Sequence, residues 1–224
     1  MKLSVVIPAY NEEKDIKRAI LDVVKHFPDA EVIVVNDAST DNTIHILMNL
    51  AVELKNLKVL TNDKNRGHGY SVVRGLKATT GDYILYIDAD RQIDLGNLAQ
   101  LEGEKYDFVS GWRTGRQDKL FRKFISFCLK MTNLIFHRMY IKDANCPFKL
   151  YRRAALFSIL DELPTTYIVP IACLEVLARQ YGLSTHTIPT PHKPYEGVRE
   201  GFLQVPNLKA WKFFASAFFE VVSL

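Results

Sequence analysis

The chain has 224 residues, of which 48% are hydrophobic, enough for one α/β domain with a sizeable core. Its formal net charge of +4 is too small for a dedicated nucleic-acid-binding protein, but it suits phosphate-bearing substrates or an anionic membrane surface. The three cysteines, Cys128, Cys146 and Cys173, form no CxxC pair, so we expect neither a disulfide framework nor a zinc site, and a reducing cytoplasm fits best.

The first half of the chain alternates between short apolar runs and helical patterns. Apolar residues recur at spacings of three and four through residues 12–27, as on one face of a helix. Runs rich in β-branched residues predict strands at 3–8, 31–37, 57–62 and 82–90. This alternation is the βαβ pattern, so it predicts a mostly parallel, Rossmann-like central sheet with helices on both faces.

Helix boundaries agree with this pattern. Asp41 and Asn42 precede a predicted helix at 43–54, and Gly67 and Gly69 open another at 70–79. The N-terminal apolar run is only a few residues long before a proline, so it is interpreted as a first strand and not as a signal peptide.

The second half is less regular. It contains predicted strands at 106–112 and 184–189, and predicted helices at 118–140, 170–182 and 207–224. We find no internal repeat and no composition break, so a single domain is expected. No apolar run reaches the roughly 18 residues that would cross a bilayer.

Polar clusters follow three of the predicted strands: PAYNEE after the first, NDAST after the second and DADRQ after the fourth. Ligands of parallel sheets collect at the carboxyl ends of the strands, so the three clusters should share one cleft.

The DADRQ cluster has the composition of a metal site. Asp88 and Asp90 flank a single small residue, and Gln92 follows two positions later. Two carboxylates and an amide oxygen suit a hard divalent ion such as Mg²⁺ or Mn²⁺. The alternative for the two carboxylates is a solvated turn or a helix cap.

Together, the segments VVIPAYNEE, VVNDASTDNT and NRGHGYSVVRGLKATTGDYILYIDAD resemble the family 2 glycosyltransferases of GT-A fold, over roughly residues 3 to 155. The resemblance implies a metal and diphosphate site at Asp88, Asp90 and Gln92. For Asp37 a helix N-cap is an equally good interpretation. The donor-binding residues that the resemblance implies are Pro8, Ala9, Tyr10, Asn11, Glu12, Asp37, Gly67 and Asp88.

The segment SGWRTGRQDKLFRKFIS resembles the acceptor-phosphate region of the polyprenyl-phosphate glycosyltransferases, the dolichol-phosphate mannose synthase group. Arg122 and Ser126 are four apart and therefore share a helix face. KPYEGVREGF resembles a late loop of that group, although Pro147 replaces a common glycine earlier and the usual Ser-Lys is absent. The implied acceptor-phosphate residues are Arg113, Arg116, Arg122, Ser126 and Arg199.

Arginines fit this chemistry because a phosphate monoester is already an anion and needs to be held, whereas a sugar hydroxyl needs a base. Asp88, Asp90 and Arg122 are therefore the predicted catalytic residues. Each arginine alone could equally be a solvated surface charge. None of the six histidines, His68 included, is assigned a role.

Apolar faces within residues 120–140 and 211–224, flanked by Lys and Arg, suit an interfacial helix that receives a lipid tail. The alternative is that these faces form core or a dimer contact. The residues of the first face are Phe121, Phe124, Phe127, Leu129 and Ile135.

The sequence thus predicts a metal-dependent, inverting transferase that moves a mannose- or glucose-type sugar from a GDP- or UDP-sugar to a polyprenyl (dolichyl) phosphate. It would be peripheral on the cytoplasmic face of a membrane, or held by a membrane-embedded partner. Residues 1–105 would form the nucleotide-sugar half, 106–200 the acceptor half, and 201–224 an amphipathic helix near the membrane. A homodimer is left open, and no nucleic-acid partner is expected.

Three alternatives stay open. The first is a family 2 transferase that uses a saccharide hydroxyl, with Asp143 as the base. The second is a nucleotidyltransferase, although PAYNEE lacks the glycine-rich basic loop of that class. The third is a non-catalytic module that binds nucleotide-sugars.

Overall fold

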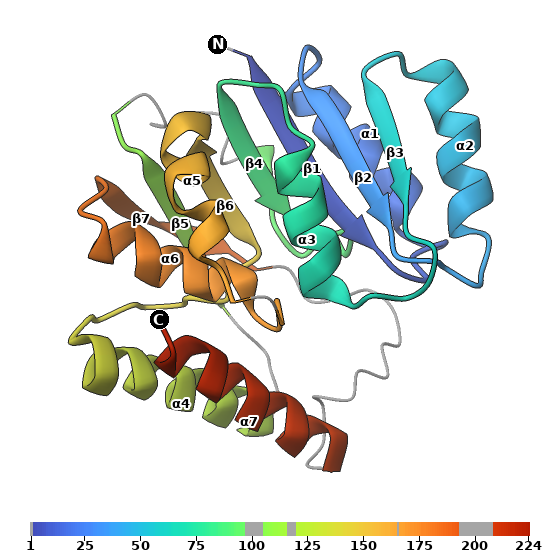
Figure 1. The fold of residues 1–224 in the computed structure, drawn as a ribbon. Coiled ribbons are helices and arrows are strands. Elements are labelled where there is room, and N and C mark those ends of the chain that lie inside the picture. Colours follow the sequence, from blue (N-terminus) through green and yellow to red (C-terminus); the bar gives the residue numbers. More distant parts are fainter. Residues whose placement is uncertain (1, 97–104, 116–119, 165, 193–207) are drawn as a thin grey trace.

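The computed structural model describes residues 2–96, 105–115, 120–164, 166–192 and 208–224 (Figure 1). In these ranges one sheet has the strand order β3-β2-β1-β4-β6-β5-β7. The strands are β1 (Leu3–Ala9), β2 (Glu31–Asn36), β3 (Leu57–Thr61), β4 (Tyr83–Ile87), β5 (Phe108–Thr114), β6 (Phe148–Arg152) and β7 (Thr185–Pro191). The helices are α1 (Ile16–His26), α2 (Thr43–Glu53), α3 (His68–Lys77), α4 (Leu120–His137), α5 (Arg153–Ile159), α6 (Pro170–Gln180) and α7 (Leu208–Val222), with a 3₁₀ turn at Leu160–Glu162.

The sheet is mostly parallel, as the sequence predicts. Parallel pairs join β1 to β2 and β4, β2 to β3, and β5 to β7. The exception is β6, which runs antiparallel between β4 and β5. The sequence prediction missed β6 because Lys149 interrupts its apolar pattern. That lysine is fully buried, and its ammonium group pairs with Glu175 of α6.

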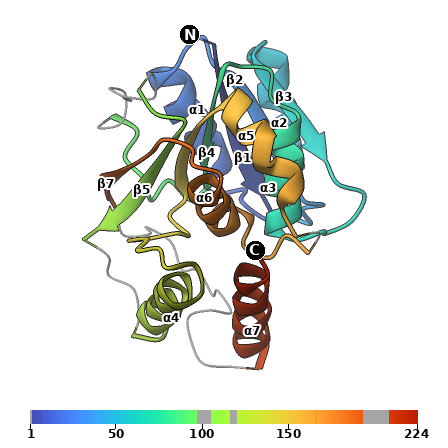
Figure 2. The same cartoon turned by 60° about the vertical axis from the view of Figure 1, so that its left-hand side comes forward.

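Helices cover both faces of the sheet, which confirms the predicted fold class (Figure 2). On β1, Val6 packs in the cluster that contains α3, α5 and α6, whereas Val5 and Ile7 pack in the cluster with α1 and α2. The alternation follows from the two-residue period of a strand. Each fully buried aliphatic side chain contributes about 1.5–3 kcal/mol, so the two-sided core is the main source of stability.

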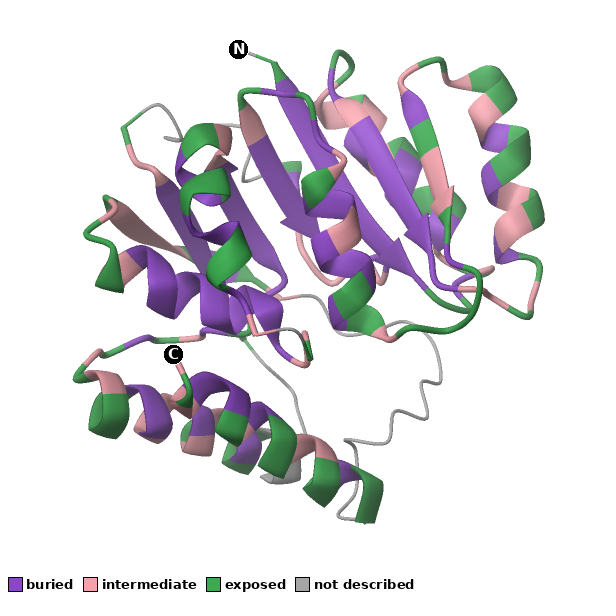
Figure 3. Ribbon diagram, in the orientation of Figure 1, coloured by how far each residue is buried: buried purple, intermediate pink, exposed green. Residues whose placement is uncertain are grey.

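Helices α4 and α7 form a pair on one side of this sandwich, next to α6 (Figures 1 and 2). The rings of Phe136 and Phe218 meet edge to face at 5.8 Å, and His137 Nε2 lies 2.8 Å from the carbonyl oxygen of Val221. Much of the outer surface of the pair is exposed (Figure 3). Among the helices within the described ranges, none is both long and apolar enough to span a bilayer.

One predicted strand boundary needs correction. Strand β4 ends at Ile87, so Asp88 and Asp90 lie in the loop after the strand and not at its end as the predicted range 82–90 implied. Leu129 is only 9% exposed and belongs to the core, which is the alternative that the sequence left open for this face of the helix.

Candidate active site

A cavity of about 370 Å³ lies at the carboxyl ends of β1, β2 and β4 and beside the first turn of α3. All three polar clusters border it, as expected from their places after parallel strands. Of the predicted donor-binding residues, Asn11 is the one absent from the lining. The cavity is lined by Pro8, Ala9, Tyr10, Glu12, Asp37, Asn65, Gly67, His68, Ser71, Asp88 and Ala89.

Asn11 holds the loop that lines the cavity. Its Oδ1 accepts a hydrogen bond from the backbone N–H of Thr40 at 2.8 Å, and its own N–H donates to Ser39 Oγ at 3.0 Å. Its φ of +54° is in the left-handed region, which asparagine adopts more readily than most residues. Asn11 therefore ties the β1–α1 loop to the β2–α2 loop.

Asp37 organises a second loop of the cavity. Its side chain accepts hydrogen bonds from Asn62 Nδ2 at 2.6 Å and from the backbone N–H groups of Arg66 and Gly67, each at 2.8 Å. The alternative interpretation of Asp37 as a helix N-cap is wrong, because α2 begins at Thr43 and its N-cap is Asn42. Gly67 has a φ of +91°, a conformation that a side chain would strain.

Asp88 is held by a chain of hydrogen bonds. The Tyr86 hydroxyl donates to Asp88 Oδ1 at 2.5 Å, and His68 Nε2 lies 3.1 Å from the same hydroxyl oxygen. Since the phenol gives its single proton to Asp88, His68 is the donor to Tyr86. Burial, and next the charge of Asp88, raise the pKa of Tyr86 well above its usual value, so it stays a donor at neutral pH.

Sequence reasoning did not single out Tyr86 or His68 for this site. The signal for Tyr86 is the strand period, because residues 86 and 88 point to the same side of an extended chain. The signal for His68 is its place directly after Gly67, in the first turn of α3.

The loop after β4 carries the remaining predicted metal ligands. Asp90 Oδ1 accepts a hydrogen bond from the backbone N–H of Gln92 at 3.2 Å. This bond closes a local turn around Arg91, whose φ is positive. Asp90 and Gln92 are outside the cavity lining. Over the described ranges, no three His, Cys, Asp or Glu side chains gather as a metal cluster. A site for Mg²⁺ requires only one or two carboxylates, since water and substrate phosphates complete its shell, so the residue types of Asp88 and Asp90 suit such an ion.

The region predicted to bind the acceptor is built around an ion pair. Arg113, at the end of β5, donates from Nε to Asp143 Oδ2 at 2.7 Å and from Nη2 to Oδ1 at 2.8 Å. The backbone N–H of Arg113 adds a third bond at 3.2 Å. The two side chains are 8% and 9% exposed. Both oxygens of Asp143 are therefore engaged by the guanidinium group that was predicted to hold a phosphate.

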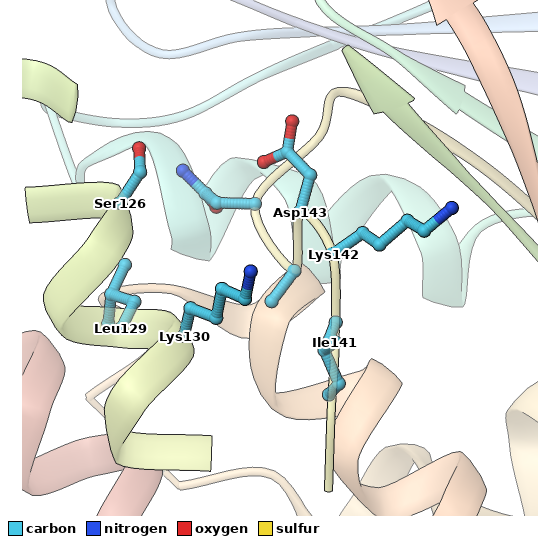
Figure 4. A pocket seen from close by; sticks show the side chains of 8 residues that line it. Ser126, Leu129, Lys130, Ile141, Lys142 and Asp143 are labelled. Atoms are coloured by element: carbon cyan, nitrogen blue, oxygen red, sulfur yellow. The ribbon is translucent and has the colours of Figure 1, made fainter. Parts of the chain in front are cut away.

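A pocket of about 20 Å³ adjoins this pair (Figure 4). Ser126 and Lys130 reach it from α4, and Lys142 and Asp143 come from the α4–β6 loop. Lys130 Nζ donates to the Tyr140 hydroxyl at 2.9 Å, and Lys142 Nζ lies 4.7 Å from the centre of the Trp112 ring. This volume admits one or two water-sized groups.

The sequence prediction named Ser126 but neither lysine. Lys130 follows Ser126 by four residues, so the helical repeat that linked Arg122 to Ser126 could have found it. The backbone of Arg122 lies in α4, but its side chain is outside the described part of the structure, as are Arg116 and Arg199 entirely.

Comparison with known proteins agrees with the fold and the strand-end motifs. The family described as Glycosyl transferase family 2 matches residues 4–160. Glucosyl-3-phosphoglycerate synthase from Mycobacterium tuberculosis, in complex with Mn²⁺ and UDP-glucose, superimposes with a TM-score of 0.70 at 19% identity, covering 99% of this chain and 78% of its own.

Two other solved structures are similar at comparable identity, which establishes the shared GT-A fold. The mannosyltransferase PcManGT from Pyrobaculum calidifontis, with GDP-Man and Mn²⁺, has a TM-score of 0.66 at 19% identity, covering 99% of this chain and 67% of its own. TarS from S. aureus, residues 1–349 with UDP-GlcNAc, has a TM-score of 0.63 at 23% identity, covering 95% of this chain and 64% of its own.

Proposed function

The chain belongs to glycosyl transferase family 2, and from that membership we propose that it transfers a mannose- or glucose-type sugar from a nucleoside diphosphate sugar to a polyprenyl phosphate. Membership of this family makes the chain a glycosyltransferase. It removes the basis for the nucleotidyltransferase and binding-module alternatives.

The cavity at the ends of β1, β2 and β4 supports the donor part of the proposal. Its walls combine buried, hydrogen-bonded Asp37 with Asp88 and a glycine-containing loop. The similar structures contain UDP-glucose, UDP-GlcNAc or GDP-Man, two of them with Mn²⁺. Asp88, Asp90 and Gln92 would hold Mg²⁺ or Mn²⁺ here. When bound, such an ion neutralises charge on the departing diphosphate.

One observation supports a phosphate acceptor over a saccharide hydroxyl: both carboxylate oxygens of Asp143 accept hydrogen bonds from Arg113. Asp143 was the candidate base for a saccharide hydroxyl. To take a proton it would have to break a bidentate pair and leave a largely buried guanidinium without its counter-charge. A phosphate monoester needs no base, so an acceptor that is already anionic fits this geometry better.

The neighbouring pocket supports the same choice. Ser126 offers a hydroxyl and Lys130 and Lys142 offer positive charge, while Arg113 neutralises the one carboxylate present. We propose that the acceptor phosphate is held here, with Arg122 and Ser126 on one face of α4.

The exposed outer faces of α4 and α7 supply a surface for the lipid. Lys209 and Lys212 flank the α7 part of this surface, as on an interfacial helix, which supports peripheral binding to the cytoplasmic face of a membrane. In this proposal residues 1–105 bind the donor and 106–200 the acceptor, and 201–224 lie near the membrane. The exposed apolar residues are Phe124, Phe127, Leu134, Ile135, Phe136, Leu208, Trp211 and Phe219.

The reaction is a single in-line displacement. An oxygen of the acceptor phosphate forms a bond to the anomeric carbon as the bond from that carbon to the nucleoside diphosphate breaks. The diphosphate leaves with the bonding electron pair, and the anomeric configuration is inverted. No proton has to be removed from the acceptor, which is why the chain needs cationic side chains there and no free base.

The proposal is tested by supplying GDP-mannose, UDP-glucose and UDP-GlcNAc in turn with Mn²⁺ and vesicles that contain polyprenyl phosphate. Mass spectrometry should detect a sugar-phosphate lipid with one of these donors. Parallel reactions replace the lipid by a free saccharide or by 3-phosphoglycerate. Equally efficient transfer to either soluble acceptor, without lipid, would refute the lipid assignment while leaving the family membership intact.

A further inference from the structure

Glu220 lies near the end of α7 with its carboxylate turned inward, and the residue is only 5% exposed. Its Oε1 accepts hydrogen bonds from Thr166 Oγ1 at 2.8 Å and from the backbone N–H of Ile168 at 2.9 Å. Its Oε2 accepts from the backbone N–H of Val169 at 2.7 Å. A single side chain of the last helix thus holds three groups of a segment more than 50 positions earlier.

The held segment leads directly into α6. Val169 is the N-cap of that helix and Pro170 its first residue, so nearby backbone N–H groups lack partners within the helix. The carboxylate of Glu220 supplies an acceptor, and its negative charge is favourable at the positive end of the helix dipole. Glu220 of α7 therefore helps to fix this segment at the start of α6.

The same segment, residues 166–170, packs closely against the first turn of α3. A Cβ atom at Gly69 would lie 1.6 Å from the carbonyl oxygen of Tyr167 and 2.9 Å from Cδ of Pro170. Glycine is the one residue type that permits this approach at position 69, because it has no Cβ atom. The preceding residues Gly67 and His68 line the cavity. Hydrogen bonds connect His68 to Tyr86 and Tyr86 to Asp88.

We propose that Glu220 is a positioning residue for donor binding, which rests on the proposed function of the cavity. Through the Thr166–Val169 contacts it fixes the carbonyl of Tyr167 against Gly69, and so the first turn of α3 that carries Gly67 and His68. Because α7 also packs on α4, the helix pair beside the acceptor region is joined by direct contacts to the wall of the donor cavity.

The test compares three variants with a control on the same helix. Glu220→Ala removes all three hydrogen bonds, Thr166→Val removes one, and Gly69→Ala inserts a methyl group on the far side of the contact. Ser223→Ala is the control, because Ser223 Oγ donates only to the backbone oxygen of Glu220 in the described part of the chain. Calorimetry gives the Kd of the nucleoside diphosphate that the wild type binds with Mn²⁺, and circular dichroism verifies folding at the assay temperature.

For Glu220→Ala we expect the Kd and the donor KM to rise roughly tenfold, and for Thr166→Val roughly twofold to threefold, since buried groups are left without partners. Gly69→Ala should raise the Kd at least as much as Thr166→Val. The acceptor KM should stay within twofold of wild type. Amide hydrogen exchange should accelerate at residues 67–71 and 166–170 but not in β2, and the control should match wild type.

A purely structural role would lower the melting temperature and leave the Kd of the folded protein unchanged. Folded Glu220→Ala with wild-type affinity and wild-type exchange at residues 67–71 would therefore overturn the inference. If that variant does not fold, Thr166→Val and Gly69→Ala decide by the same two measurements. A wild-type chain that binds no nucleotide refutes the proposed donor site instead, and exchange at residues 67–71 still tests the positioning role.

Discussion

The two halves of the sheet use their charged residues differently. At the ends of β1, β2 and β4 the carboxylates accept hydrogen bonds from neutral groups: Asp37 from an amide side chain and two backbone N–H groups, and Asp88 from a phenol. Beside β5, the carboxylate of Asp143 is neutralised by Arg113. The first arrangement keeps negative charge at a cavity of about 370 Å³, and the second removes it from a pocket of about 20 Å³.

This difference suits two ligands of different kind. Negative charge held by neutral donors is suited to attract a divalent cation, which in turn binds a diphosphate. A region in which the carboxylate is cancelled and lysines are added is suited to an anion directly. Each half can therefore be disrupted separately by substitution. We expect the proposed donor side, at the ends of β1, β2 and β4, to respond more strongly than the proposed acceptor side beside β5.

Loss of charge on the donor side should have the largest effect. We expect Asp88→Asn to reduce transfer about a thousandfold, because the electrostatic stabilisation of the leaving diphosphate is lost. Adding EDTA to the wild type should have a similar effect, reversed by Mn²⁺. The exposed carboxylate of Asp29 provides the matched control, Asp29→Asn. Retention of most of the activity in Asp88→Asn would contradict the metal assignment.

Breaking the ion pair of the acceptor side should cost mainly stability. Asp143→Ala leaves Arg113 largely buried without its counter-charge, so we expect the free energy of unfolding to fall by about 3 kcal/mol. Replacing both partners, Arg113→Met with Asp143→Leu, should recover much of that loss, as measured by urea denaturation. The double variant should still transfer sugar. Complete inactivity of a stable double variant would restore Asp143 as a candidate base.

Substitution of Asp37 tests whether the shape of the cavity loop affects nucleotide binding independently of the metal ligands. Asp37→Asn brings an amide –NH₂ into a site built from N–H donors, which should cost about 1–3 kcal/mol of stability and weaken nucleotide binding. Thermal unfolding with and without nucleotide measures both effects. Asp63→Asn, in the loop between β3 and α3 that Asp37 binds, is the control. The Asp63 side chain is 69% exposed, so we expect this substitution to change neither stability nor nucleotide binding. Equal behaviour of the two variants would remove Asp37 from the site.

The smallest effect is expected from the lysines of the pocket. Lys130→Ala and Lys142→Ala should each raise the KM for lipid phosphate by roughly threefold to tenfold, because each removes one positive charge near an anion in partly solvated surroundings. The donor KM should not change, and added salt should reduce the difference from wild type. Lys64→Ala, on the donor half, is the control. An unchanged acceptor KM in both lysine variants would place the phosphate elsewhere.

Much of the donor side could be predicted from the sequence. Strand periodicity located β1, β2, β3 and β4 within a few residues, and polar residues directly after parallel strands must meet at one edge of the sheet. That reasoning predicts that Tyr10, Asp37 and Asp88 lie at a common site, and all three line the cavity. It failed for Asn11, whose place after β1 is correct but whose side chain binds the neighbouring loop.

The sequence by itself thus determined the βαβ order and the edge of the sheet at which the polar clusters gather, because these depend on short-range periodicity and on the residue types directly after each strand. Tertiary structure alone decided which charged side chains find a partner within the fold. Arg113 meets Asp143 across 30 positions, Lys149 meets Glu175 across 26, and Glu220 reaches Val169 across 51. A charged residue looks the same in the sequence whether it awaits a ligand or is paired within the fold, since its partner is chosen by packing.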